Sequence, residues 1–236
     1  MGQLRSFRNR LHAGKLLAGA LTAYAGAEQA IVLALPRGGV PVGFVIAHEL
    51  GLPLDVLIVR KLGLPGHEEY AIGAVGSSGV RVIQPEVLKA FGVSQAALEQ
   101  ICMRELSEIA RRERQFRGAR PWPVLAGKTV ILVDDGLATG STMMAAIEIA
   151  RRQAPARLIA AVPVGAQLSC VALEAEVDEL ICLLRPADFR AVGQWYRHFE
   201  QTTDEEVQDL LALAWRDHTQ TVPPLHHPTT RYGGTA

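Results

Sequence analysis

Two adjacent carboxylates, Asp134 and Asp135, lie in the middle of the segment 130–142, which reads VILVDDGLATGST. They follow an apolar run typical of a buried strand, and a helical pattern begins after them at Ser141 and Thr142. The glycines between let backbone N–H groups approach an anion, which the hydroxyls and the helix dipole would also face. Carboxylates at a strand end can accept hydrogen bonds from sugar hydroxyls. The segment therefore predicts a sugar-phosphate site.

Other interpretations of this segment are weaker. The loop lacks the lysine of G-x-x-x-x-G-K-[ST], and the chain contains no G-x-G-x-x-G, so neither a P-loop nor a classical dinucleotide site is supported. Asp134 and Asp135 alone would fit a turn followed by a helix cap. The full order of strand, acidic pair, small-residue loop and helix favours a ligand site.

Basic residues and glycines follow two further apolar runs. Arg37, Gly38 and Gly39 come after the run 31–35, where a basic side chain and free backbone N–H groups would suit a second anion. Arg60 and Lys61 come after the run 54–59. A turn with an exposed arginine and an ordinary basic strand end are the alternatives. Their positions after predicted strands agree with the stronger segment.

The segment 130–142 closely resembles the signature of the type I phosphoribosyltransferases, which is an apolar strand, two acidic residues and a loop x-x-[AT]-T-G-x-T. The combination Leu-Pro-Arg-Gly-Gly, Val-Arg-Lys and Asp-Asp-Gly-x-Ala-Thr-Gly resembles a bacterial group of predicted phosphoribosyltransferases without a settled acceptor. This resemblance implies that phosphoribosyl pyrophosphate, with Mg²⁺, ribosylates an unidentified acceptor and releases pyrophosphate. It places the protein in nucleotide metabolism.

The resemblance also assigns roles to individual residues. Asp134 and Asp135 would hold the ribose hydroxyls, and would reach Mg²⁺ only indirectly through ribose or water. The 5-phosphate would be cradled by Ala138, Thr139, Gly140, Ser141 and Thr142. The pyrophosphate would be bound by Gly38, Gly39 and Arg60, with Arg37 and Lys61 as the catalytic cations.

Acceptor specificity in this family comes from a variable hood. Trp195 and Tyr196 lie in an aromatic stretch whose rings would stack on a base, or would instead anchor the last helix to the core. Ala138 occupies the position where hypoxanthine and guanine transferases carry an acidic residue. That substitution makes a 6-oxopurine acceptor less favoured.

The surrounding pattern predicts an α/β fold with an open parallel sheet and helices on both faces. Apolar runs predict strands at 31–35, 54–59, 129–133, 158–164 and 179–184, and helical periodicity appears at 41–50, 95–114, 141–153 and 167–174. Residues 72–75 and 80–83 predict an inserted β-hairpin, and the family resemblance makes 61–78 a mobile loop and hairpin with candidate hinges at Gly63 and Gly66.

We expect one domain over residues 1–217, with a core at about 30–184 and a small hood from the N-terminal helix and about 185–215. Residues 218–236 have the composition of a disordered tail. The basic stretch before residues 16–27 mimics a secretory signal, but the helical spacing of Phe7, Leu17 and Leu21 favours an amphipathic helix packed on the domain.

Composition narrows the function classes. The 24 basic and 24 acidic residues cancel, so the charge balance argues against a nucleic-acid partner. Three widely spaced cysteines fit a reducing cytoplasm, and no apolar stretch is long enough for a membrane span. A homodimer is compatible with the sequence.

Two alternative functions share the predicted fold and donor site. The first is a regulatory protein that binds phosphoribosyl pyrophosphate without transferase activity. The second, diphosphokinase synthesis of phosphoribosyl pyrophosphate, ranks lower because no further nucleotide-binding segment is present.

Overall fold

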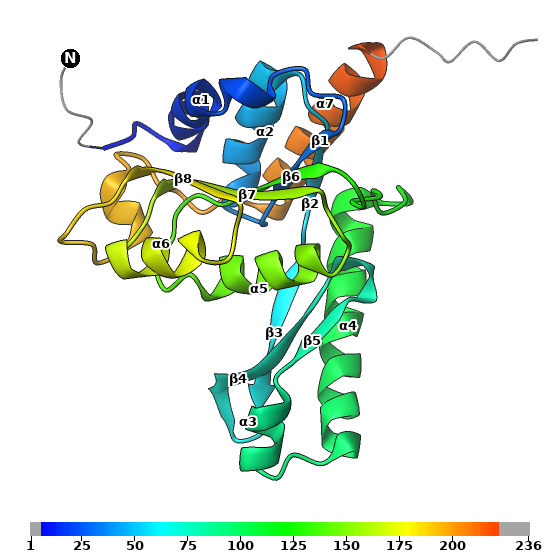
Figure 1. Ribbon diagram of the computed structural model, residues 1–236. Coiled ribbons are helices and arrows are strands. Elements are labelled where there is room, and N and C mark those ends of the chain that lie inside the picture. Colours follow the sequence, from blue (N-terminus) through cyan, green and yellow to red (C-terminus); the bar gives the residue numbers. More distant parts are fainter. Residues whose placement is uncertain (1–5, 222–236) are drawn as a thin grey trace, which may run out of the picture.

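A parallel sheet with the strand order β2-β1-β6-β7-β8 lies at the centre of the computed structural model, which describes residues 6–221 (Figure 1). The strands are β1 (Ala30–Ala34), β2 (Leu54–Val56), β6 (Thr129–Val133), β7 (Arg157–Val164) and β8 (Glu179–Leu184). Both faces of the sheet are covered, which explains why β1 is apolar and buried throughout. The predicted α/β fold class is confirmed.

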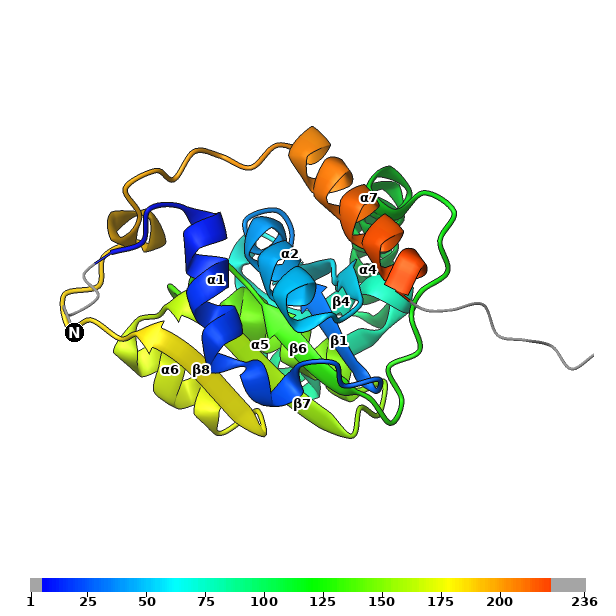
Figure 2. The same ribbon diagram turned by 90° about the horizontal axis from the view of Figure 1, so that it is seen from above.

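Helices pack on the two faces of this sheet. α1 (Arg10–Ala20), α2 (Gly39–Leu50) and α7 (Asp204–Thr221) lie on one face, and α5 (Ser141–Arg151) and α6 (Gln167–Glu174) on the other (Figures 1 and 2). Successive residues of β6 point into separate cores: Ile131 and Val133 pack on one face, and Val130 and Leu132 on the other. Packing on both faces therefore fixes the position of β6 in the sheet, and with it the position of the acidic pair that follows.

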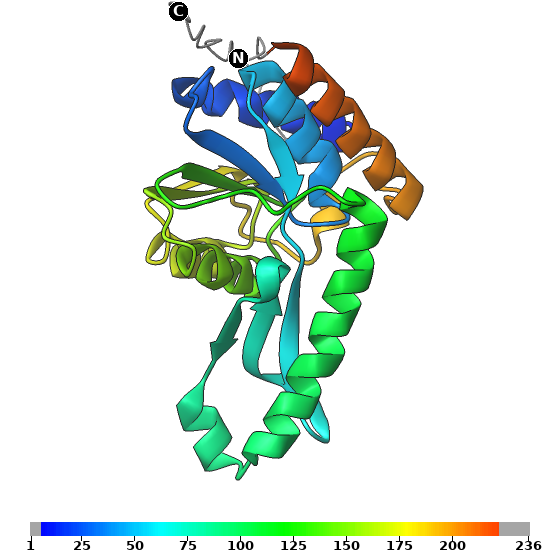
Figure 3. The same ribbon diagram turned by 90° about the vertical axis from the view of Figure 1, so that its right-hand side faces the viewer.

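A second, antiparallel sheet forms an arm that extends away from the central sheet (Figures 1 and 3). It contains β3 (Val59–Leu64), β4 (His67–Gly76) and β5 (Arg81–Ile83), with α3 (Pro85–Ala90) and α4 (Gln95–Arg117) beside it. The predicted hairpin is present between β4 and β5. α3 is short and the sequence pattern did not indicate it.

Two further expectations concern the entry to the arm and its first two strands. The predicted strand over 54–59 is divided, because the chain leaves the parallel sheet after Val56 and resumes in β3. The segment 61–78, expected as a mobile loop and hairpin, is mostly paired: β3 and β4 form an antiparallel ladder with Lys61 opposite Ala74. Backbone hydrogen bonding thus orders the segment, and Gly66 supplies the positive φ of the turn.

The hood brings the N-terminal segment against residues 195–197. The Phe7 N–H donates to the Trp195 carbonyl at 2.8 Å, and the Arg197 N–H donates to the Phe7 carbonyl at 2.9 Å. Phe7, Leu17 and Leu21 are fully buried, so the N-terminal segment packs on the domain. No helix within residues 6–221 combines the length and apolar character needed to cross a membrane.

α7 continues to Thr221, so the proposed boundary at residue 217 falls inside a helix. The first residues of the expected disordered tail are therefore helical. The remainder of that tail lies outside the described residues.

Candidate active site

The carboxyl end of β6 presents the acidic pair beside the end of β1, since Ala34 pairs with Val133 across the two strands. This is the edge at which open parallel sheets bind ligands. The loop that follows turns through Gly140, whose φ of 76° is left-handed, and enters α5. Ala138, Thr139 and Thr142 are exposed, and the Thr139 and Ser141 hydroxyl oxygens lie 2.7 Å apart. The loop therefore offers hydroxyls and a helix N-terminus to an anion.

The Gly38–Gly39 turn lies directly against the acidic pair. A Cβ atom at Gly38 would lie 2.1 Å from Asp135 Oδ2, and one at Gly39 would lie 2.5 Å from the Val133 carbonyl oxygen. Any side chain would collide, so glycine is required by close approach. Two segments far apart in the sequence thus lie side by side at the carboxyl end of β6.

Gly38→Ala is expected to lower the free energy of unfolding by about 1–3 kcal/mol, as overpacking does in tight interiors. The φ of −60° and ψ of −31° at Gly38 suit alanine, so the effect would be steric. Urea denaturation would measure it. Gly19→Ala is the matched control, because no atom lies within 4 Å of the added methyl. Equal stability of the two variants would contradict the close contact.

Burial makes the acidic pair unusual. Burial raises the pKa of Asp134 well above its ordinary value, and the neighbouring Asp135 charge adds to that rise. The Asp135 N–H, which donates to Asp134 Oδ1 at 2.8 Å, opposes it. Burial also raises the pKa of Asp135, opposed by the charge and hydrogen bond of Arg10. Holding two carboxylates here therefore costs stability.

Arg10, the first residue of α1, compensates the Asp135 charge. Its Nε donates to Asp135 Oδ2 at 2.8 Å, its Nη2 lies 2.8 Å from the same oxygen, and its Nη1 donates to the Glu200 carbonyl at 2.7 Å. The guanidinium lies 3.9 Å from the centroid of the Phe199 ring. No local pattern in the sequence indicates this role, because 125 positions separate Arg10 from Asp135.

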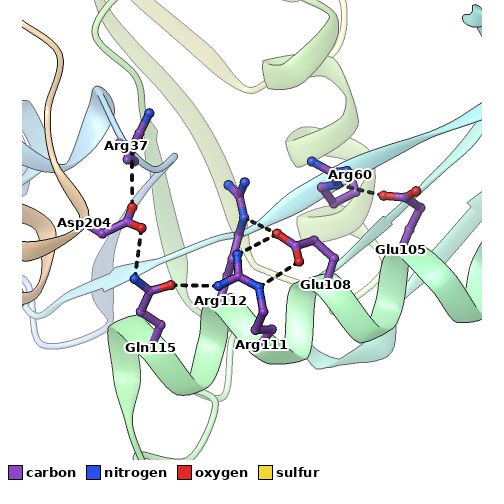
Figure 4. Close-up of polar contacts among 8 residues, drawn as sticks. All are labelled: Arg37, Arg60, Glu105, Glu108, Arg111, Arg112, Gln115 and Asp204. Atoms are coloured by element: carbon purple, nitrogen blue, oxygen red, sulfur yellow. Dashed lines mark hydrogen bonds and ion pairs between the residues drawn. The ribbon is translucent and has the colours of Figure 1, made fainter.

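The predicted cations occupy different surroundings (Figure 4). Arg37 Nη1 lies 3.6 Å from Asp204 Oδ1, next to a pocket of about 410 Å³ that it lines together with residues 201–205. Arg60 donates to Glu105 of α4 at 2.8 Å, and Lys61 is exposed on β3. Arg37 immediately precedes the Gly38–Gly39 turn in the sequence, whereas Arg60 is paired with Glu105 within the arm.

The two aromatic candidates for the acceptor pocket lie in the hood. Tyr196 is buried, its hydroxyl donates to the Asp135 carbonyl at 2.6 Å, and its ring lies 5.3 Å from that of Phe7 and 4.9 Å from that of Phe199. Burial raises the pKa of the Tyr196 hydroxyl, with the Asp135 charge adding to the rise. Trp195 packs in the same cluster, and its Nε1 is buried without a partner among the described residues. Tyr196 thus anchors the hood to the strand end.

The residues fit a magnesium ion that arrives with its substrate. Within residues 6–221 no group of three or more His, Cys, Asp or Glu side chains is placed to hold a metal. Mg²⁺ typically keeps several waters and binds one or two carboxylates together with substrate phosphates. Asp134 and Asp135 supply a carboxylate pair of that kind beside the Gly38–Gly39 turn and the loop 138–142.

Known proteins are similar to this chain in sequence and in architecture. The family described as "Phosphoribosyl transferase domain" matches residues 2–192. Proteins from two strains of Mycobacterium tuberculosis, provisionally named phosphoribosyl transferases, are each 43% identical over 214 residues. The matches cover 91% of this chain and 48% of each relative, so the chain spans about half the length of these curated relatives. The crystal structure of TT1426 from Thermus thermophilus is 43% identical with a TM-score of 0.79, covering 87% of this chain and 97% of that one.

Proposed function

This chain belongs to the phosphoribosyl transferase domain family, and from that premise we propose that it transfers the phosphoribosyl group of phosphoribosyl pyrophosphate to an acceptor. One observation carries the proposal: the Asp134–Asp135 pair lies against the Gly38–Gly39 turn and is followed in the chain by the loop 138–142, in which Ala138, Thr139 and Thr142 are exposed. A ribose bound at the pair would extend a phosphate toward each segment. That arrangement suits a donor with anionic groups at both ends.

Each part of the donor has matching groups in the chain. The hydroxyls and backbone N–H groups at 138–142 bind the 5-phosphate, and Asp134 and Asp135 accept hydrogen bonds from the ribose hydroxyls. Gly38 and Gly39 let their turn pack against the acidic pair, and Arg37 and Lys61 neutralise the pyrophosphate at that turn. Arg60, which donates to Glu105 in the free site, adds a further positive charge for the pyrophosphate.

The reaction breaks the bond between ribose C1 and a pyrophosphate oxygen. Positive charge develops on the ribose and negative charge on the leaving group, so the site must stabilise both. The two carboxylates face the first charge, and Arg37 and Lys61 the second. Mg²⁺, when bound, would neutralise phosphate charge as a Lewis acid. Trp195 is a candidate to contact the acceptor, with Tyr196 fixing the hood.

The reaction can be tested with phosphoribosyl pyrophosphate, Mg²⁺ and separate pools of nucleobases and small amines. We expect release of pyrophosphate that depends on one pool and yields a new ribosyl product, and we expect chelation by EDTA to stop it. Pyrophosphate release would be coupled to an optical assay, and products identified by mass spectrometry.

Two outcomes would contradict transferase activity. Tight binding of phosphoribosyl pyrophosphate without turnover by any pool would favour a regulatory protein. If phosphoribosyl pyrophosphate did not bind at millimolar concentration, its assignment as the donor would be wrong as well. Asp188→Asn, an exposed hood variant, serves as a control for altered surface charge.

A further inference from the structure

Asp204, the first residue of α7, connects two parts of the molecule through its two carboxylate oxygens (Figure 4). Oδ1 lies 3.6 Å from Arg37 Nη1, and Oδ2 accepts a hydrogen bond from Gln115 Nε2 of α4 at 2.9 Å. The first contact is long for an ion pair, and both of its side chains are more than a third exposed. The second is a hydrogen bond of ordinary length. Asp204 is therefore held more firmly by α4 than by Arg37.

The neighbours of Gln115 fix its orientation. Arg111 Nη1 donates to Gln115 Oε1 at 3.2 Å, and Arg111 in turn donates twice to Glu108, at 2.8 and 2.9 Å. Gln208 of α7 donates to the Gln115 carbonyl at 2.6 Å. These contacts tie α7 to α4 independently of Arg37. If Arg37 moved away, the Asp204 carboxylate would keep its position.

We propose that Asp204 is a positioning residue. It holds Arg37 beside the Gly38–Gly39 turn when the site is empty, and Arg37 leaves Asp204 to contact pyrophosphate when that ligand binds. This inference rests on the proposed function, because it requires pyrophosphate at that turn. A multiply charged pyrophosphate attracts a guanidinium more strongly than one half-exposed carboxylate does. Asp204 therefore competes with pyrophosphate for Arg37, which weakens product binding and speeds its release.

Removing the competitor is expected to tighten pyrophosphate binding. Asp204→Asn keeps an oxygen that can accept from Gln115 but removes the charge that attracts Arg37. Exposed ion pairs contribute little, so we expect Asp204→Asn to bind magnesium pyrophosphate about threefold more tightly than wild type. Asp204→Glu is expected to restore affinity toward the wild-type value. Titration calorimetry with the full chain would measure the dissociation constants.

Glu206→Gln is the matched control, because it removes the same charge from the same helical turn without an Arg37 contact. Glu206 is exposed, and its side chain makes no hydrogen bond or ion pair with residues 6–221. The affinity of Glu206→Gln for magnesium pyrophosphate should stay close to that of wild type. A thermal melt of each variant would verify that α7 is folded, and affinities would be compared only between variants that melt like wild type.

Three results would overturn the inference. Unchanged or weaker binding by Asp204→Asn would show that Arg37 is not held back by Asp204. An equal gain from Glu206→Gln would show a general charge effect. In both cases the proposed transferase function would stand. If wild type binds neither pyrophosphate nor phosphoribosyl pyrophosphate, the proposed function fails, and the inference fails with it.

Discussion

Asp134→Asn is expected to weaken binding of phosphoribosyl pyrophosphate by about 10- to 100-fold while making the free protein more stable at pH 7. The loss of affinity follows from replacing charged acceptors of the ribose hydroxyls, since hydrogen bonds to charged groups contribute about 1.5–3 kcal/mol each. The gain in stability follows from removing a carboxylate whose charged form is disfavoured by burial and by Asp135.

The stability gain should depend on pH in a defined direction. The pKa of Asp134 is raised in the folded protein, so at neutral pH its ionisation favours the unfolded chain. As the pH falls through the raised pKa, the folded protein takes up a proton that the unfolded chain does not yet bind, and the penalty disappears. The advantage of Asp134→Asn should therefore be largest at about pH 7–8 and vanish near pH 4.

Calorimetry for the ligand and urea denaturation across this pH range would test both parts. Asp188→Asn, which makes the same replacement at an exposed position, should change neither affinity nor stability appreciably. If Asp134→Asn kept the wild-type affinity for phosphoribosyl pyrophosphate, Asp134 would not belong to the ribose site. A stability gain that grew toward low pH would show that its pKa is depressed rather than raised.

The sequence predicted well those features that local patterns determine. The strand 129–133 and the helix 167–174 have the bounds expected from apolar runs and periodicity. The order of strands and helices also placed the acidic pair at the open edge of the sheet, because the carboxyl ends of parallel strands share that edge. The same argument placed the end of the run 31–35 at that edge, in agreement with the family resemblance that assigned 35–39 to the pyrophosphate.

Features that depend on long-range contacts could not be predicted. How much of 61–78 is paired depends on the register of β3 with β4, and the glycines and apolar residues of the segment do not determine that register. Arg10 and Asp204 belong to the site only because α1 and α7 pack over the same face of the sheet. Their types and spacing resemble those of ordinary surface residues, so no local signal distinguishes them.

Arg10→Ala is expected to lower the free energy of unfolding by about 3 kcal/mol, as happens when one partner of a buried ion pair is removed. The side chains of Arg10 and Asp135 are 13% and 15% exposed, so solvent would compensate the remaining Asp135 charge poorly. The variant also loses the hydrogen bond to the Glu200 carbonyl and the contact with Phe199. Because α1, the end of β6 and the hood meet at this guanidinium, the hood should loosen as well.

The electrostatic part of this loss can be separated by pH and by a double-mutant cycle. Without Arg10 the pKa of Asp135 should rise further, so the destabilisation should be greatest at about pH 7–8 and smaller as the pH falls toward about 4. Asp135→Asn added to Arg10→Ala should cost less than the sum of the two single changes. Arg8→Ala, which removes an exposed arginine nearby, is the control. Additive single effects, or an equal loss from Arg8→Ala, would show that the pair does not stabilise the site, and the two carboxylates would then have to be held together without it.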